Sequence, residues 1–370
     1  MRRFLWIAFL VVDALLLCFF VAGYLGRYVD PRSFWWPQLF AVALPTLSIL
    51  LLLATPVFVA VKRWGMFGLH LAFVGLILVR FAALGTALNP PVNTSPTLRI
   101  ASYNLGHFEI FSQAEQARKL GEVLGLLYPD ILGLQEFLVH YRGQELRIRN
   151  LPYVANKLDS LGFQAVARNR HDVPSTFKPI WTRKDKLVQQ AKNRVKIKEN
   201  DFEAMSFMRM EFEWAGRVGV FYNVHMRTFG SKKPWLDENM SPMSPKFWLF
   251  YIRQYREAFQ YRAWEAARIK QLLEEEEMPV ILAGDFNSTP HNWAFNHLKE
   301  GLQDVHAHRG NLFRTSYHVR FPLAKIDHIL VSSDWQVYSA TIPPLNYSDH
   351  RPVIAEIGWA DPATAAVALP

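Results

Sequence analysis

The chain has 370 residues, of which 51% are hydrophobic, 14% aromatic and 20% charged. This length and apolar content exclude a disordered polymer and a disulfide-stapled miniprotein, and they leave room for two or three folded units. The one cysteine excludes a disulfide framework within a single chain and a zinc site built on cysteine ligands. The formal net charge of +9 favours anionic partners such as nucleic acid, lipid head groups or phosphorylated small molecules.

Three long apolar runs occupy the first quarter of the chain, at Phe4–Gly26, Phe34–Val61 and Met66–Leu88. Each is long enough to cross a hydrocarbon core, which needs roughly 20 helical residues. We therefore predict a membrane anchor of three transmembrane helices at residues 1–88, with the lipid bilayer as its partner. A cleaved signal peptide is the alternative for the first run, but this run is long and lacks a clear small-x-small cleavage site.

The loops between these runs set the expected orientation. Four basic residues lie on one side of the membrane and two on the other, namely Arg2, Arg3, Lys62 and Arg63 against Arg27 and Arg32. Because cytoplasmic loops carry the excess of basic residues, we expect a cytoplasmic N-terminus. After three spans, the rest of the chain would be exoplasmic, or periplasmic in a bacterium.

One charged residue lies near the middle of the first run and another near the middle of the third, Asp13 and Arg80. An isolated charge in hydrocarbon is costly and usually faces a partner. We therefore predict a structural ion pair between them rather than an ion pathway.

Residues 89–97 are rich in proline, asparagine and serine, which predicts a linker before a folded domain at 98–360 and a tail at 361–370. In that domain, short apolar runs separated by turn residues predict strands at 98–104, 131–135, 218–224, 280–283, 326–332 and 353–357. Helical patterns lie between some of them. One is capped by Ser112, and another runs from about Phe247 to Glu277.

Polar residues capable of catalysis stand at the ends of these predicted strands. Those that follow or close a strand are Asn104, Glu136, His225, Asp285 and Asn287, and those at strand beginnings are Asp327, Asp349 and His350. If they share one rim, some strands must run opposite to others, because an all-parallel sheet presents such residues at carboxyl ends only. This predicts a mixed or antiparallel sandwich and excludes a Rossmann sheet. Each motif alone also fits a turn, a cap or a structural histidine, and only their combination favours a site.

The order of these motifs resembles that of the endonuclease/exonuclease/phosphatase superfamily over about Arg99 to Ile357. Its specific part is Gly284-Asp-Phe-Asn287 together with the later Ser348-Asp-His350. The resemblance implies an α/β fold, a four-layer α/β sandwich with two mixed β-sheets. It also implies hydrolysis of a phosphate ester in nucleic acid, phospholipid or inositol phosphate, and leaves nuclease and lipid or inositol phosphate hydrolase both open. The alternative is a non-catalytic anion-binding or scaffold module on the same fold, which is expected to lose some of these positions.

Phosphate ester hydrolysis suits a hard cation with oxygen ligands, and the expected cofactor is Mg²⁺, with Mn²⁺ as the alternative. The resemblance implies that Glu136 is the main carboxylate ligand. Asn104 would supply an amide oxygen or a phosphate contact, and Asp349 a further carboxylate near the metal.

The resemblance also implies the catalytic roles. Asp285 would orient or deprotonate the attacking water while Asn287 holds it. Asp327 would pair with His350 and fix a charged imidazole against a phosphate oxygen. His225 would contact phosphate or assist the leaving group.

Two stretches fall outside this pattern. Residues 140–199 carry 14 basic and five acidic residues, which fits a solvated insertion and a patch for an anionic substrate or membrane equally well. Residues 232–260 are rich in aromatic residues, which favours a helix packed on the sandwich over a substrate lid or interfacial contact. No protein partner is predicted.

Overall fold

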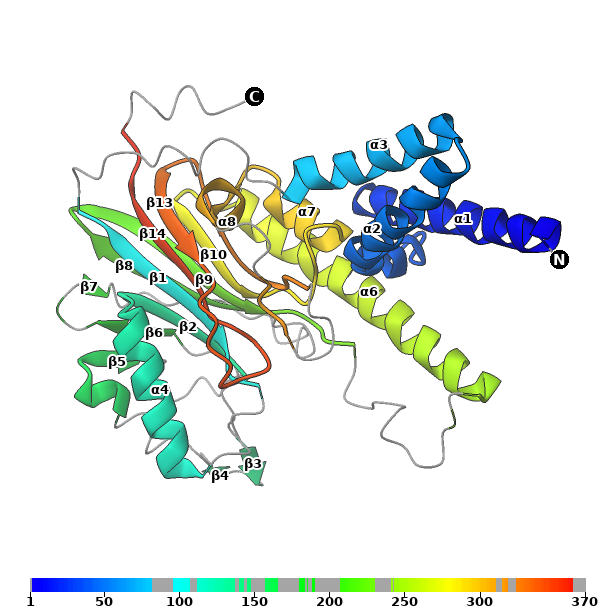
Figure 1. Cartoon of the computed structure of the whole chain (residues 1–370). Helices are drawn as coiled ribbons and strands as arrows, with labels where there is room; N and C mark the ends of the chain where they lie inside the picture. Colours follow the sequence, from blue (N-terminus) through cyan, green and yellow to red (C-terminus); the bar gives the residue numbers. More distant parts are fainter. Residues whose placement is uncertain are drawn as a thin grey trace. The chain divides into compact units, whose positions relative to one another are not determined.

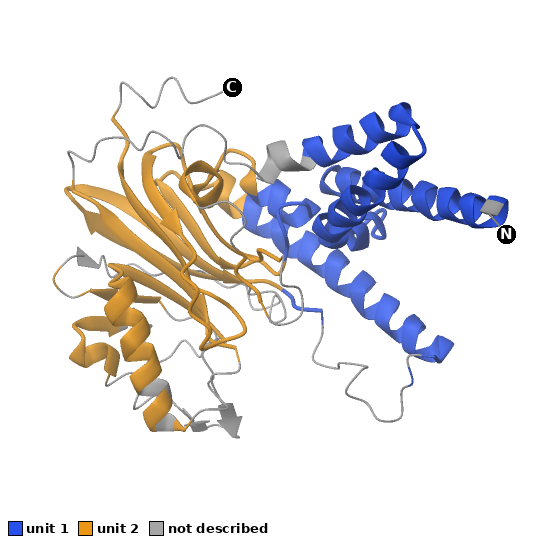
Figure 2. Ribbon diagram, viewed as in Figure 1, with its two compact units in different colours: residues 1–84, 227–270, 288–298 blue, residues 85–226, 271–287, 299–370 orange. Residues whose placement is uncertain are grey.

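The computed structural model divides the chain into two compact units, coloured separately in Figure 2. It describes residues 2–81, 96–106, 112–136, 140–142, 145–147, 157–165, 180–183, 185, 188–189, 207–229, 241, 243–310, 315–318 and 324–361. The first unit, here called the helical unit, comprises residues 1–84, 227–270 and 288–298. The second, here called the sandwich unit, comprises residues 85–226, 271–287 and 299–370.

The helical unit contains the apolar N-terminal helices expected from the sequence (Figure 1). Its elements are α1 (Arg2–Leu25), the 3-10 helix η1 (Gly26–Tyr28), α2 (Pro37–Ala60), α3 (Trp64–Phe81), α6 (Pro245–Glu274) as far as Lys270, and α7 (Trp293–Lys299) as far as Leu298. Two helices, at Arg3–Tyr28 and Pro37–Ala60, are long and apolar enough to cross a membrane. Pro37 starts α2 at a position where its fixed φ suits a helix and its missing N–H costs no hydrogen bond.

The third expected span, Met66–Leu88, is not matched by a helix of that length. Helix α3 ends at Phe81, and its searched part, Trp64–Leu76, is only a shorter apolar helix. Residues 82–95, with the end of the apolar run and most of the expected linker, lie outside the described residues. Within the described residues there are thus two candidate spans, where the sequence predicted three.

Asp13 in α1 is buried, and its partner is a histidine of α3. His70 Nε2 lies 2.9 Å from Asp13 Oδ1, and His70 Nδ1 lies 2.8 Å from the carbonyl oxygen of Met66. Both side chains are almost wholly removed from solvent. The structure therefore pairs Asp13 with His70, and the side chain of Arg80, the expected partner, lies outside the described residues.

Two six-stranded sheets form the sandwich unit. In hydrogen-bonding order, the first sheet contains β13 (Trp335–Thr341), β14 (Val353–Trp359), β1 (Leu98–Asn104), β2 (Ile131–Gln135), β6 (Ile180–Arg183) and β5 (Phe163–Ala165). The second contains β11 (Gln303–Asp304), β12 (Asp327–Val331), β10 (Val280–Asp285), β9 (Arg217–His225), β8 (Phe207–Trp214) and β7 (Val188–Gln189). A separate hairpin pairs β3 (His140–Arg142) with β4 (Glu145–Arg147).

Both large sheets are mixed. Strand β1 runs parallel to β2 and antiparallel to β14, and β10 runs parallel to β9 and antiparallel to β12. Polar residues at the ends of β1, β2, β9 and β10 can therefore share a rim with residues at the beginnings of β12 and β14. The predicted α/β sandwich with two mixed sheets is confirmed, and a Rossmann sheet is excluded.

An apolar layer fills the space between the facing sheets, with side chains such as Ile100, Phe221 and Ile329 fully buried. Helix α4 (Gln113–Leu127) covers the outer face of the first sheet, as the sequence predicted. Its buried side chains follow the helical spacing, at Leu120, Val123, Leu124 and Leu127. Burial of each contributes roughly 1.5–3 kcal/mol relative to exposure.

Caps define both ends of α4. Ser112 and Glu115 form a reciprocal capping box at the first turn. The helix ends at Leu127, and the next residue, Tyr128, takes a left-handed conformation with φ of 42°. At the start of the short helix α8 (Val305–Arg309), Asp304 provides the corresponding cap by accepting from the His306 amide. These caps satisfy N–H groups that have no partner within the helix.

Gly284 has a tight position on β10, immediately before Asp285. Its φ is +147°, and a Cβ built there would lie 2.0 Å from the carbonyl oxygen of Val224. We predict that Gly284→Ala lowers the free energy of unfolding by at least about 3 kcal/mol, because backbone strain adds to a clash with neighbouring backbone. Chemical denaturation measures it. Gly216→Ala is the control, with φ of +74° and nothing within 4 Å, and an equal loss in both variants would contradict the prediction.

Candidate active site

The strand pairing brings residues from different parts of the chain to one end of the second sheet. Asp285 closes β10 and is paired in register with His225 of β9 on one side and with Asp327 of β12 on the other. Asn104 closes β1 in the first sheet, and its Nδ2 donates to Asp285 Oδ2 over 2.9 Å. The two sheets therefore meet at the Asp285 carboxylate.

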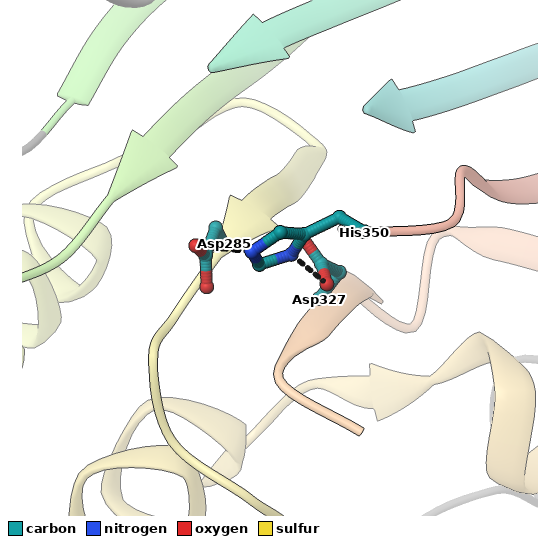
Figure 3. A group of neighbouring side chains, drawn as sticks. All are labelled: Asp285, Asp327 and His350. Atoms are coloured by element: carbon teal, nitrogen blue, oxygen red, sulfur yellow. Dashed lines mark hydrogen bonds and ion pairs between the residues drawn. The ribbon is translucent and has the colours of Figure 1, made fainter. Parts of the chain in front are cut away.

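Three buried titratable groups surround this point, as Figure 3 shows. His350 Nδ1 lies 2.8 Å from Asp327 Oδ2, and His350 Nε2 lies 3.9 Å from Asp285 Oδ2. The pairing fixes the imidazole ring between the two carboxylates. Asp327 is itself held by its backbone N–H, which donates to Ser316 Oγ over 2.9 Å.

The electrostatics of this group push two pKa values toward neutral and basic pH. Burial, followed by the charge of Asp327, raises the pKa of Asp285 to about 7. Burial alone would lower the pKa of His350, but the charges of Asp327 and Asp285 outweigh it and raise that pKa to about 10. The same interactions therefore favour the charged form of His350 and the protonated form of Asp285.

Asn287 holds the same carboxylate from the other side. Its backbone N–H donates to Asp285 Oδ1 over 2.8 Å, and its side-chain Nδ2 donates to Asp285 Oδ2 over 3.2 Å. Nδ2 also donates to the carbonyl oxygen of Met226 over 2.9 Å. Asn287 adopts a left-handed φ of 48°, which asparagine tolerates better than most residues.

His225 faces two acids without a direct hydrogen bond to either. Its Nε2 lies 3.6 Å from Glu136 Oε1 and 3.7 Å from Asp285 Oδ2. These separations leave the ring beside both carboxylates at longer than hydrogen-bonding distance. Glu136 has a left-handed φ of 50° and a half-exposed side chain, so its carboxylate is open to solvent.

The three predicted metal ligands converge on Gly106. A Cβ built on this glycine would lie 2.7 Å from Asp349 Oδ1, 3.1 Å from Glu136 Oε2 and 3.4 Å from Asn104 Oδ1. A larger residue would therefore press on the Asp349 carboxylate. Three oxygen atoms of the kind that Mg²⁺ prefers thus lie near one backbone position, where Asn104 Oδ1 also accepts from the Gly106 N–H over 2.8 Å.

Two groups of residues in the described part of the chain could accordingly hold a cation. Asp285, Asp327 and His350 offer ligand atoms within 4.8 Å of one another. A histidine ligand must lose its proton to bind a metal, and the raised pKa of His350 opposes that loss. Asn104, Glu136 and Asp349 provide only hard oxygens and fit Mg²⁺ or Mn²⁺ better. The first group is better suited to proton transfer and charge stabilisation.

Sequence reasoning missed the residues that support this site. Ser348 Oγ lies 2.9 Å from the carbonyl oxygens of both Asn104 and Gly106, and it accepts from the His350 amide over 3.1 Å. The hydroxyl therefore ties the Ser-Asp-His segment to the end of β1. The position of Ser348 in the Ser-Asp-His motif is the one feature of the sequence that could have pointed to it.

A buried amide pair joins the two sheets below the site. Gln135 Nε2 donates to Asn223 Oδ1 over 2.6 Å, and Asn223 Nδ2 donates to the carbonyl oxygen of Leu134 over 2.9 Å. Gln135 directly precedes Glu136 and Asn223 lies two residues before His225, and the sequence analysis gave neither of them a role. All eight predicted site residues are described and share the sandwich unit, whereas most of the basic stretch 140–199 lies outside the described residues.

Comparisons with known proteins identify the family of this chain. Residues 101–350 match the model of the Endonuclease/Exonuclease/phosphatase family. A search of curated proteins gives no match. Solved structures similar to this chain include an endonuclease/exonuclease/phosphatase family protein from Bacteroides thetaiotaomicron, with 18% identity and a TM-score of 0.49, covering 72% of this chain and 99% of that one.

Two further solved structures are similar to this chain over a comparable share of its length. A mannosyl-6-phosphatase from Bacteroides thetaiotaomicron has 18% identity and a TM-score of 0.47, with coverage of 71% of this chain and 100% of that one. The human Nocturnin catalytic domain has 17% identity and a TM-score of 0.46, with coverage of 74% and 100%. Because the family match spans well over half of the 370 residues, this chain belongs to the endonuclease/exonuclease/phosphatase family.

Proposed function

We propose that the protein is a membrane-tethered phosphoesterase that uses Mg²⁺ or Mn²⁺ to hydrolyse a phosphodiester or phosphomonoester. One observation carries the proposal. Three oxygen ligands converge around Gly106 beside the buried Asp285–Asp327–His350 group, to which Asn104 is directly hydrogen bonded. An oxygen site next to acid–base groups is the combination that phosphate ester hydrolysis needs.

Asn104, Glu136 and Asp349 would hold the metal in this proposal. The bound cation would supply positive charge for the oxygens on which negative charge develops as water attacks phosphorus. Asn104 has a second task, because its amide N–H group also fixes the Asp285 carboxylate.

The remaining residues act on protons and charge. With a pKa near 7, Asp285 can accept a proton from water at neutral pH, and Asn287 keeps its two oxygens oriented. Protonated His350, paired with Asp327, offers positive charge to a phosphate oxygen. His225 stands beside Glu136 and Asp285, where it can contact the phosphate or the leaving group.

The membrane part of the proposal is supported by the two long helices. Side chains that α1 and α2 leave exposed are largely apolar, for example Val12, Leu15, Leu50 and Leu53. A helix in a soluble core would bury such residues. We propose residues 1–88 as an integral anchor, 89–97 as a linker, 98–360 as the catalytic domain and 361–370 as a tail, with a cytoplasmic N-terminus.

The first test concerns the metal. The full chain in nanodiscs should hydrolyse at least one of DNA, RNA, sphingomyelin, phosphatidylinositol phosphates or a simple phosphodiester when Mg²⁺ or Mn²⁺ is present, and should stop in excess chelator. Glu136→Gln and Gly106→Ala should each weaken Mn²⁺ binding by tenfold or more in calorimetric titration, because the first removes a charge and the second fills the space between the ligands.

Gly125→Ala is the matched control for this test, since a Cβ on that helical glycine meets nothing within 4 Å. Unchanged Mn²⁺ affinity in folded Gly106→Ala, or full turnover in chelator, would refute the metal site. A non-catalytic module would show no turnover with any substrate even when the metal binds.

The second test concerns proton transfer. We expect Asp285→Asn and His350→Ala to lower kcat by at least about a hundredfold, because they remove the proposed proton acceptor and a positive charge that stabilises the transition state. Steady-state kinetics on folded protein measure this. Ser339→Ala, an exposed change on β13 that removes a hydroxyl bonded to Glu356, should leave kcat unchanged. Near-normal turnover in either site variant would reject its role.

The third test concerns membrane topology. Protease added to intact cells or spheroplasts should cleave the chain after residue 98 if the apolar run 66–88 crosses the membrane as a third span, because three spans after a cytoplasmic N-terminus make the catalytic domain exoplasmic. The same digestion after permeabilisation of the membrane provides the reference. Protection of the domain in intact cells would contradict the exoplasmic placement and would fit two spans, and release of the chain by alkaline carbonate would argue against integral spans.

A further inference from the structure

Gln38, in the first turn of α2, has a buried side chain with every hydrogen-bonding position in use. Its Nε2 donates to the carbonyl oxygens of Gly26 and Val29, over 2.6 Å and 3.0 Å. Its Oε1 accepts from Asn292 Nδ2 and from the Trp293 backbone N–H, each over 3.1 Å. An amide has two donor hydrogens and two acceptor positions, so the side chain is saturated.

These bonds join two segments that are 254 residues apart in the sequence. Both belong to the helical unit, which takes in residues 288–298 along with the N-terminal helices (Figure 2). The first segment is the loop between α1 and α2. The second begins directly after Asn287 and leads into α7.

Asn292 carries the network toward Asn287. Its Oδ1 accepts from the backbone N–H of Thr289 over 3.0 Å and from Thr289 Oγ1 over 2.8 Å. Thr289 is two residues beyond Asn287. The chain that leaves the proposed catalytic residues is therefore fixed by Asn292, which is in turn held by Gln38.

Aromatic and charged side chains next to Gln38 also join the same two segments. The Arg32 guanidinium, paired with Asp30, lies over the Trp293 ring at 5.5 Å, and the Trp293 ring stacks on His297 at 4.4 Å. A simple loop between two membrane helices does not need this fit. A fully satisfied buried polar network instead specifies one arrangement, because any partial loss leaves costly unpaired groups.

We propose that Gln38 is a positioning residue for the catalytic loop, defined as residues 285–292. It acts through Asn292 and Thr289 on the chain that follows Asn287. The inference rests on the proposed function, since it takes Asp285 and Asn287 as catalytic. A displacement of about 1 Å in such a loop can lower the rate by up to about a hundredfold.

The experiment compares variants of the full chain in nanodiscs. Gln38→Met keeps the length of the side chain but removes all of its hydrogen bonds. We expect it to lower kcat by about tenfold or more while KM changes by less than about twofold, and to speed hydrogen exchange at the amides of Thr289 and Trp293. Ser48→Ala is the control. It removes a buried hydroxyl from the same helix, and this hydroxyl donates to the carbonyl oxygen of Leu44 in that helix.

A second variant approaches the network from the other side. Asn292→Leu should reproduce the loss of kcat, and the double variant with Gln38→Met should lose no more than the stronger single variant, because the two residues act as one unit. If Gln38→Met does not fold, Asn292→Leu alone still tests whether the Gln38–Asn292 hydrogen bond affects kcat. Additive losses would overturn the inference.

The exchange measurement separates this inference from the proposed function. If folded Gln38→Met has the wild-type kcat and unchanged hydrogen exchange, Gln38 does not position the catalytic loop, and the phosphoesterase proposal still stands. If the wild-type chain hydrolyses none of the substrates, the phosphoesterase proposal fails, and with it the claim that Gln38 positions catalytic residues. Faster exchange in Gln38→Met together with lower kcat, and with neither change in Ser48→Ala, is the result that supports the inference.

Discussion

Burial of the Asp285 carboxylate is the constraint on which the site depends. The group is 1% exposed and close to a second buried acid, Asp327, so two like charges must be held together without water. Such an arrangement is stable only with compensating donors and positive charge. Asn104, Asn287 and His350 supply them, and each comes from a different element of the chain.

This requirement explains why the sandwich is built from mixed sheets. Asp285 ends a strand, Asp327 begins the antiparallel neighbour, and the segment with His350 precedes β14. Strands of both directions must therefore end at one rim. In our proposal, the same rim holds the metal ligands near Gly106 and the groups that transfer protons near His350. Asn104 joins the two, since its oxygen faces one group and its N–H group the other.

Much of this fold could be predicted because the signals are local. Continuous apolar runs located β1 and β2 at their observed ends, and the Ser112–Glu115 box marked the start of α4. Strand direction followed from which end of each run carried polar residues. Strands β8 and β13 were missed, because their alternating patterns lie in sequence without such a polar marker.

The remaining differences come from contacts without a local signal. A count of formal charges does not point to histidine, which the structure places beside Asp13. Among the described residues two helices are long and apolar enough to span a membrane, and the end of the third apolar run lies outside those residues. Gln38 and Asn292 are ordinary polar residues in sequence, and only the folded chain brings them together.

The account's central claim is that a divalent cation binds among Asn104, Glu136 and Asp349, beside the Asp285 group and not within it. Anomalous diffraction at the manganese edge, from crystals of the full chain grown with Mn²⁺, tests this most directly. The account predicts one strong peak next to Gly106, in contact with the Glu136 carboxylate, which disappears in Glu136→Gln. A peak ligated by His350, or none at either place, would contradict it.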